Sequence, residues 1–144
     1  MIATQLFGEI EIGDDHLVTM PDGLFGFPGC SSFALLPAGR EGFLWLQSTD
    51  HATLAFLLVD PFLYFEGYTV DLTGPVLQRL GTSESSDVNV FAIVTLPGAG
   101  GEATANLQGP VVLNVATRRG FQAVLQDSEF GTREPILLEQ GAAH

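Results

Sequence analysis

The stretch LAFLLVDPFLYF, residues 54–65, decides the fold of this chain. Its first six residues are apolar, a run too short to span a membrane and typical of a strand that is buried on both faces. Pro61 has no N–H to give to a sheet and favours an extended conformation at the residue before it. The sequence therefore predicts a central strand over Leu54–Val59 that ends at Asp60.

After this break, three aromatic rings occupy four positions, 62–65. We expect part of this cluster to close the core and the edge of Tyr64 to reach the surface together with Glu66. Asp60 has two interpretations, because a carboxylate at a strand end can serve a site, whereas aspartate before proline also forms turns that cap their own backbone. The structural role is the favoured one.

The rest of the chain predicts short strands at close intervals. One short helix is expected where Thr73 can cap, Pro75 can occupy the first turn and Gly81 can end it. A hairpin with Gly120 in the left-handed conformation is expected between the last two strands. The expected strands, the first with a bulge or bend at Gly8, cover residues 4–12, 16–20, 33–36, 43–47, 88–96, 111–115 and 121–125.

This pattern predicts a mostly β protein, a compact antiparallel β-barrel-like single domain with one or two short helices. A closed barrel and a compact sandwich both remove exposed sheet edges, and the two long apolar runs favour the barrel. We expect the domain to cover residues 1–137, followed by a frayed tail over 138–144, where the periodic apolar pattern ends.

The charge balance is strongly acidic. Among 144 residues, 17 are acidic and five are basic, for a formal net charge of −12. All five basic residues are arginines, so direct binding to nucleic acid or to an anionic membrane is disfavoured. This charge has two interpretations: it serves solubility alone, or it steers a basic protein partner toward the molecule. With a lone Cys30 and no signal-peptide pattern at the N-terminus, we expect a soluble cytoplasmic protein that is a monomer when free.

No catalytic constellation is visible in the sequence. His16, His51 and His144 lack metal-ligand spacing, and Cys30 has no histidine near it in sequence, so we expect no metal, no cofactor and no enzyme activity. The glycine-rich segment 97–101 lacks the lysine of a phosphate loop. The dense aromatic residues with acidic neighbours are instead typical of a protein-binding surface.

Four ordered motifs resemble the FliW family of flagellar assembly factors. They are FGEIEI at Phe7–Ile12, PDGLFGFPG at 21–29, the long segment Trp45–Leu72, and Thr104–Ile136. The resemblance implies a regulator without enzyme activity that binds newly made flagellin in the cytoplasm. When flagellin is exported, such a protein is free to bind the translational repressor CsrA, which then releases flagellin messenger RNA.

For this expected role we select five acidic and aromatic residues as the partner-binding surface: Asp60, Tyr64, Glu66, Asp127 and Glu129. Each of them also has the alternative of a turn-forming or merely solvated residue. The competing function is a flavin-binding small β-barrel oxidoreductase, in which Trp45 or Tyr64 would stack on the flavin ring. The five arginines offer no obvious clamp for the flavin phosphate.

Overall fold

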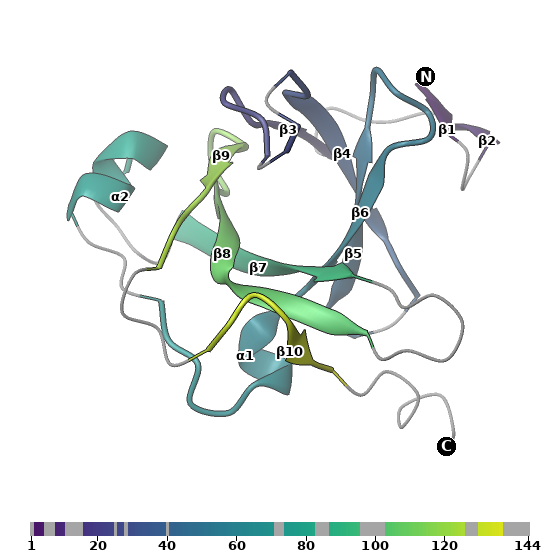
Figure 1. The fold of residues 1–144 in the computed structure, drawn as a ribbon. Helices are drawn as coiled ribbons and strands as arrows, with labels where there is room; N and C mark the ends of the chain where they lie inside the picture. Colours follow the sequence, from purple (N-terminus) through teal and green to yellow (C-terminus); the bar gives the residue numbers. More distant parts are fainter. Residues whose placement is uncertain are drawn as a thin grey trace.

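The structure is a computed structural model of the chain, and the residues that it describes form ten strands and two short helices (Figure 1). It describes residues 2–4, 8–10, 16–24, 26–27, 29–39, 41–70, 74–82, 87–95, 103–125 and 130–136. In chain order, the elements are β1 (Ile2–Thr4), β2 (Gly8–Ile10), β3 (Leu17–Thr19), β4 (Ser32–Pro37), β5 (Phe43–Ser48), β6 (Ala55–Val59), α1 (Pro61–Tyr64), α2 (Gly74–Leu80), β7 (Val88–Thr95), β8 (Thr104–Asn114), β9 (Arg119–Gln122) and β10 (Glu134–Pro135).

Strands β3 to β9 form a closed seven-stranded barrel. Neighbouring strands from β3 to β8 pair in antiparallel fashion along the sequence, and β8 continues to β9. One parallel contact closes the ring, where Thr19 N–H donates to the Arg118 carbonyl at 2.9 Å. β10 pairs with the first half of β8. The predicted mostly β, barrel-like fold is confirmed. Of the two alternatives, the structure is the closed barrel and not the sandwich.

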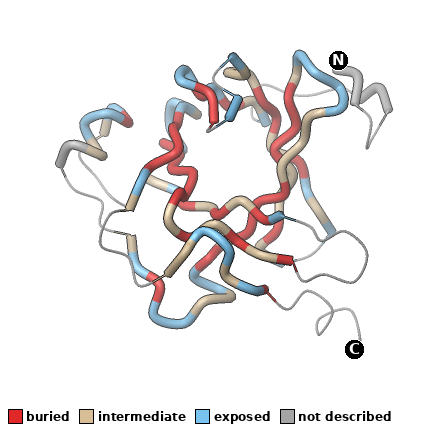
Figure 2. The backbone as a smooth tube through the Cα atoms, in the orientation of Figure 1, coloured by how far each residue is buried: buried red, intermediate tan, exposed pale blue. Residues whose placement is uncertain are grey.

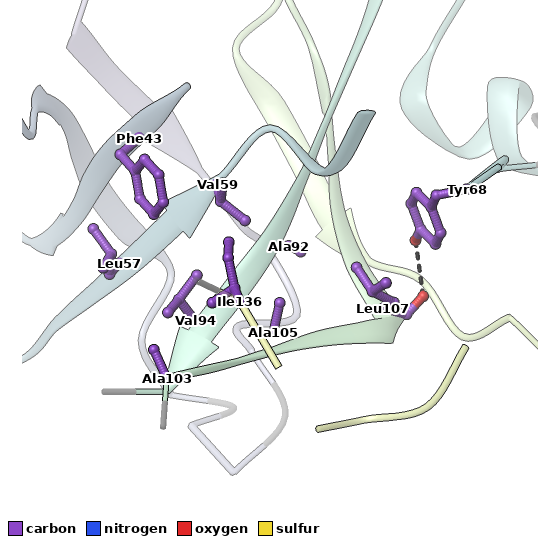
Figure 3. Close-up of a cluster of buried hydrophobic side chains, with 10 residues drawn as sticks. All are labelled: Phe43, Leu57, Val59, Tyr68, Ala92, Val94, Ala103, Ala105, Leu107 and Ile136. Atoms are coloured by element: carbon purple, nitrogen blue, oxygen red, sulfur yellow. Dashed lines mark hydrogen bonds between the residues drawn. The ribbon is translucent and has the colours of Figure 1, made fainter. Parts of the chain in front are cut away.

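The core lies inside this ring. Figure 2 shows that buried residues concentrate on the strands of the barrel wall. The predicted central strand is confirmed as β6, and its Leu58 and Val59 are fully buried. One cluster of core side chains extends from β5 and β6 across β7 to β8, and Tyr68 lies at its edge (Figure 3).

β8 contains a large β-bulge opposite Ala92, which the sequence did not predict. Phe91 pairs with Val111 and Ile93 with Asn106, so residues 107–110 lie opposite Ala92 alone. Proline is tolerated at such a bulge, although it would disrupt a central strand. The bulge lets the two halves of β8 pair with different strands, β10 and β9.

The carbonyl groups of the bulge find partners from distant parts of the chain. The Tyr68 hydroxyl donates to Leu107 O at 2.8 Å, and Gln122 Nε2 donates to Gly109 O at 2.8 Å (Figure 3 shows the first bond). Ala123 N–H and Leu125 N–H donate to the carbonyls of residues 110 and 108. Buried backbone groups require such partners, so these bonds make the bulge compatible with a closed barrel.

Two sequence predictions are wrong in detail. The expected single strand over 4–12 is wrong, because Thr4 ends β1 and Gly8 begins β2, and these two strands pair with each other in a separate antiparallel sheet, Ile2 with Ile10 and Thr4 with Gly8. Gly8 therefore lies in a regular pair and not in a bulge, and residues 5–7, 11 and 12 lie outside the described residues. In the β8–β9 hairpin, Arg118 has the left-handed conformation, with φ of 60°, and Gly120 does not. Glycine is needed at 120 for space, because a Cβ there would lie 2.2 Å from Val112 O.

The predicted helix over 73–81 is confirmed as α2, and Gly81 follows it with φ of 80°. Its expected cap, Thr73, lies outside the described residues, as do the segment 97–101 and the tail 138–144. Asn114 connects the hairpin to the end of α2: its Nδ2 donates to Leu80 O, and its Oδ1 accepts from Ala116 N–H. No helix among the described residues is long and apolar enough to cross a membrane.

Candidate partner-binding surface

The Asp-Pro break after β6 starts a one-turn helix, α1. Asp60 is its N-cap: it is extended, and its Oδ1 accepts a hydrogen bond from Phe62 N–H at 3.0 Å. Pro61 occupies the first helical position, where its missing N–H costs nothing, and its ring is buried. The favoured structural interpretation of Asp60 therefore agrees with this geometry, and the helix itself is an element that the sequence did not predict.

α1 is fixed to the turn before β5. Asp60 N–H donates to Gly42 O at 2.7 Å, and the Tyr64 hydroxyl donates to the carbonyl of Glu41 at 2.8 Å. Gly42 has φ of 83°, and a Cβ on it would lie 2.9 Å from Leu63 Cδ1. This close approach and backbone conformation require glycine, so the helix lies flat against the turn.

Two large apolar side chains remain on the outer face of this fixed helix. Phe62 is 50% exposed and Leu63 is 56% exposed. The inner ring of the same cluster, Tyr64, packs edge-on against Phe43 with 5.2 Å between ring centroids. The cluster 62–65 thus closes the core only in part, as expected, and its other part forms a small exposed apolar surface.

Behind α1, a second aromatic group belongs to the core. Tyr68 lies 5.5 Å from the Phe130 ring and 5.7 Å from the Phe62 ring, and it is only 4% exposed. Burial raises the pKa of Tyr68 from 10.0 to about 12, because the charged phenolate would lose its hydration. The Tyr68 hydroxyl therefore stays neutral and can donate its hydrogen bond to Leu107 O in the bulge of β8.

The structure brings together three of the five selected residues. Asp60, Tyr64 and Glu66 all lie on or beside α1, with Asp60 and Tyr64 half-buried and Glu66 exposed. Asp127 and Glu129 lie outside the described residues. The sequence predicted that part of the cluster 62–65 reaches the surface, but it did not single out Phe62 and Leu63, because phenylalanine and tyrosine favour strands. The signal for α1 was the Asp60-Pro61 pair, an N-cap residue followed by proline at the first helical position.

Other chemistry receives little support from the described residues. They contain no group of three or more metal-ligating side chains, and His51 is exposed in the β5–β6 turn. Two arginines make structural contacts: Arg118 Nε donates to Leu17 O at 2.8 Å, and Arg79 forms an ion pair with Asp22 above the Phe121 ring.

The flavin alternative is not supported. The Trp45 ring is partly buried against the core cluster rather than displayed as a stacking platform. Tyr64 is bonded to Glu41 O and packed against Phe43, so its ring is part of the attachment of α1.

Comparison with known proteins identifies the family. The sequence model described as FliW protein matches residues 1–136. The chain is 42% identical over 142 residues to a flagellar assembly factor FliW of Treponema denticola, covering 99% of this chain and 97% of that protein. It is 38% identical over 140 residues to the protein of the same name from Moorella thermoacetica, covering 96% and 89%.

A solved structure agrees with the sequence relatives. The crystal structure of a flagellar assembly factor FliW superimposes with a TM-score of 0.85 at 36% identity, covering 96% of this chain and 98% of the other. The fold and the sequence thus point to the same group of proteins over nearly their whole length. This chain belongs to the FliW family of flagellar assembly factors.

Proposed function

We propose that this flagellar assembly factor works in the cytoplasm as a monomer that exchanges two protein partners, newly made flagellin and the translational repressor CsrA. Binding to CsrA prevents CsrA from holding flagellin messenger RNA, and translation resumes. The observation that carries the proposal is the match of nearly the whole chain to flagellar assembly factors. The protein acts by binding, without a reaction of its own.

The charge of the chain supports a basic partner. The net charge of −12 attracts a basic RNA-binding protein and repels the RNA that this protein holds. RNA and this chain then bind CsrA with unfavourable coupling, typically about 1–3 kcal/mol, or exclude each other. Affinity for CsrA should fall steeply between low and physiological salt, and a binding constant that stays flat would contradict the electrostatic part of the proposal.

The α1 corner is the proposed contact surface for CsrA, with Asp60, Tyr64 and Glu66 as its described members and Asp127 and Glu129 as further candidates. Exposed apolar area beside acidic groups is a composition that protein interfaces use. Glu66→Lys reverses a charge at an exposed position and should weaken CsrA binding with little change in melting temperature. Unchanged affinity would remove Glu66 from the surface.

Titration calorimetry tests the exchange itself. The purified protein is titrated with CsrA and with flagellin, each alone and each with the other partner already bound. The proposal predicts binding to both partners, with a large loss of affinity for the second one. Full binding of both at once would contradict the exchange, and binding to neither would contradict the proposed function as a whole.

A further inference from the structure

A groove of about 370 Å³ lies between α1 and β7. It is lined by Asp60, Phe62, Val70 and the β7 residues 88–91. Phe62 forms one wall, with its ring tilted against Tyr68 at 5.7 Å and half of its surface exposed. Among the described lining residues, Asp60 carries the one carboxylate and Asn89 the one amide, and the other side chains are apolar.

The walls of the groove are held in place before any partner binds. The N-cap of Asp60, the buried Pro61 and the bond from Tyr64 to Glu41 O fix α1, and the β7 residues 88–91 are paired with β8. Preorganised walls lower the entropy lost on binding, and central interface anchors typically fill such pockets. At this groove, Tyr64 acts by holding α1, and with it Phe62, in position.

The charge at this groove selects its occupant. Asp60 Oδ1 accepts the Phe62 N–H, and no residue that the structure describes bonds Oδ2. Two exposed glutamates lie near α1. Glu66 follows the helix in sequence, and Glu41 accepts the Tyr64 hydrogen bond at its carbonyl. A partner that buries an apolar side chain here must approach acidic groups, so a cation beside that side chain is favoured.

Resting on the proposed function, we infer that this groove receives a large apolar side chain of the basic partner, CsrA, whose neighbouring arginine or lysine bonds Asp60. Phe62 is the contact residue for the apolar side chain, and Asp60 has two roles, the cap of α1 through one oxygen and the partner contact through the other.

Calorimetry with purified CsrA tests the inference with two unlike variants. Phe62→Ser removes one wall, and Asn89→Trp fills the groove from an exposed position of β7 where an aromatic residue suits a strand. Each should reduce affinity for CsrA by about 30-fold, the loss that is typical of a central interface anchor. Val124→Ser is the matched control, because Val124 is 64% exposed and lies outside this groove, and its affinity should stay within about twofold of the wild type.

Asp60→Asn separates the two roles of this residue, because asparagine keeps the cap acceptor and loses the charge. It should weaken CsrA binding and reduce its salt dependence, with an unchanged melting temperature. If Phe62→Ser and Asn89→Trp both bind CsrA like the wild type, the groove is not the contact, and the proposed function stands. If the wild type itself does not bind CsrA, both are overturned.

Discussion

The two tyrosines of the chain lie four residues apart and make the same hydrogen bond in two different regions. Tyr64 donates to Glu41 O at 2.8 Å from the half-buried inner side of α1. Tyr68 donates to Leu107 O at 2.8 Å from the core, where the bulge of β8 leaves a carbonyl that the sheet does not pair. One bond attaches a surface element, and the other completes the barrel.

This difference separates the proposed partner surface from the part of the molecule that stabilises the fold. Near Tyr64, water can replace a lost hydrogen bond, so the surface around α1 can change at a small cost in folding free energy. Near Tyr68, water cannot replace the lost hydrogen bond, so the bulge of β8 depends on the Tyr68 side chain. The comparison predicts that paired substitutions at the two positions have unequal effects.

The largest expected effect comes from removing each ring. Tyr68→Ala should lower the free energy of unfolding by about 3–5 kcal/mol, as for other buried aromatic residues, because it leaves both a cavity and an unpaired Leu107 O. Tyr64→Ala should cost about 1–2 kcal/mol, since its ring is half-buried. Urea denaturation of the two variants measures both values, and equal losses would contradict the distinction between the regions.

Removing only the hydroxyl groups isolates the two hydrogen bonds. Tyr68→Phe keeps the ring and should cost about 1–3 kcal/mol, because a buried carbonyl loses its donor. Tyr64→Phe should cost about 0.5 kcal/mol or less, because water reaches Glu41 O in its place. The same denaturation curves check this, and a larger loss at Tyr64 would mean that α1 is buried in solution.

The cap of α1 gives a further, smaller effect. Asp60→Ala should lower the free energy of unfolding by about 1 kcal/mol through loss of the bond to Phe62 N–H, and Asp60→Asn by only a few tenths. Thermal unfolding of the two variants compares them. If Asp60→Asn is as damaging as Asp60→Ala, the charge of Asp60 stabilises the fold, and the partner role assigned to its second oxygen loses its basis.

The titration of Tyr68 changes the stability only at alkaline pH, so at neutral pH it is the smallest effect. Its pKa is about 12 in the fold against 10.0 in an ordinary environment, because burial disfavours the phenolate. A raised pKa in the folded state gives a contribution to stability that is complete below pH 10 and is lost as the pH rises toward 12. Unfolding curves across this range should show the loss in the wild type, and Tyr68→Phe should lack it. A parallel decline in both proteins would assign it to other groups.

The sequence predicted the barrel where its signals were local. The apolar run before Asp60-Pro61, the apolar run of β7 and the Gly81 stop all depend on neighbouring residues. The first half of β8 was missed, because Asn106, Gly109 and Pro110 disfavour strands, and the donors that satisfy its bulge come from far along the chain. No local pattern contains that information.

The candidate surface shows the same division. Asp60, Tyr64 and Glu66 could be placed together because they are close in sequence. The exposure of Phe62 and Leu63 could not be predicted, because it depends on which side of α1 packs. That side is set by Gly42 and Phe43, about twenty residues earlier.

The central claim is that the acidic α1 surface removes CsrA from flagellin messenger RNA until flagellin occupies the protein. Fluorescence anisotropy of a labelled flagellin messenger RNA leader bound to CsrA measures this directly. Adding the protein should lower the anisotropy, Phe62→Ser should require far more protein for the same decrease, and flagellin added last should restore the signal. RNA that stays bound to CsrA at saturating concentrations of the wild-type protein would contradict the account.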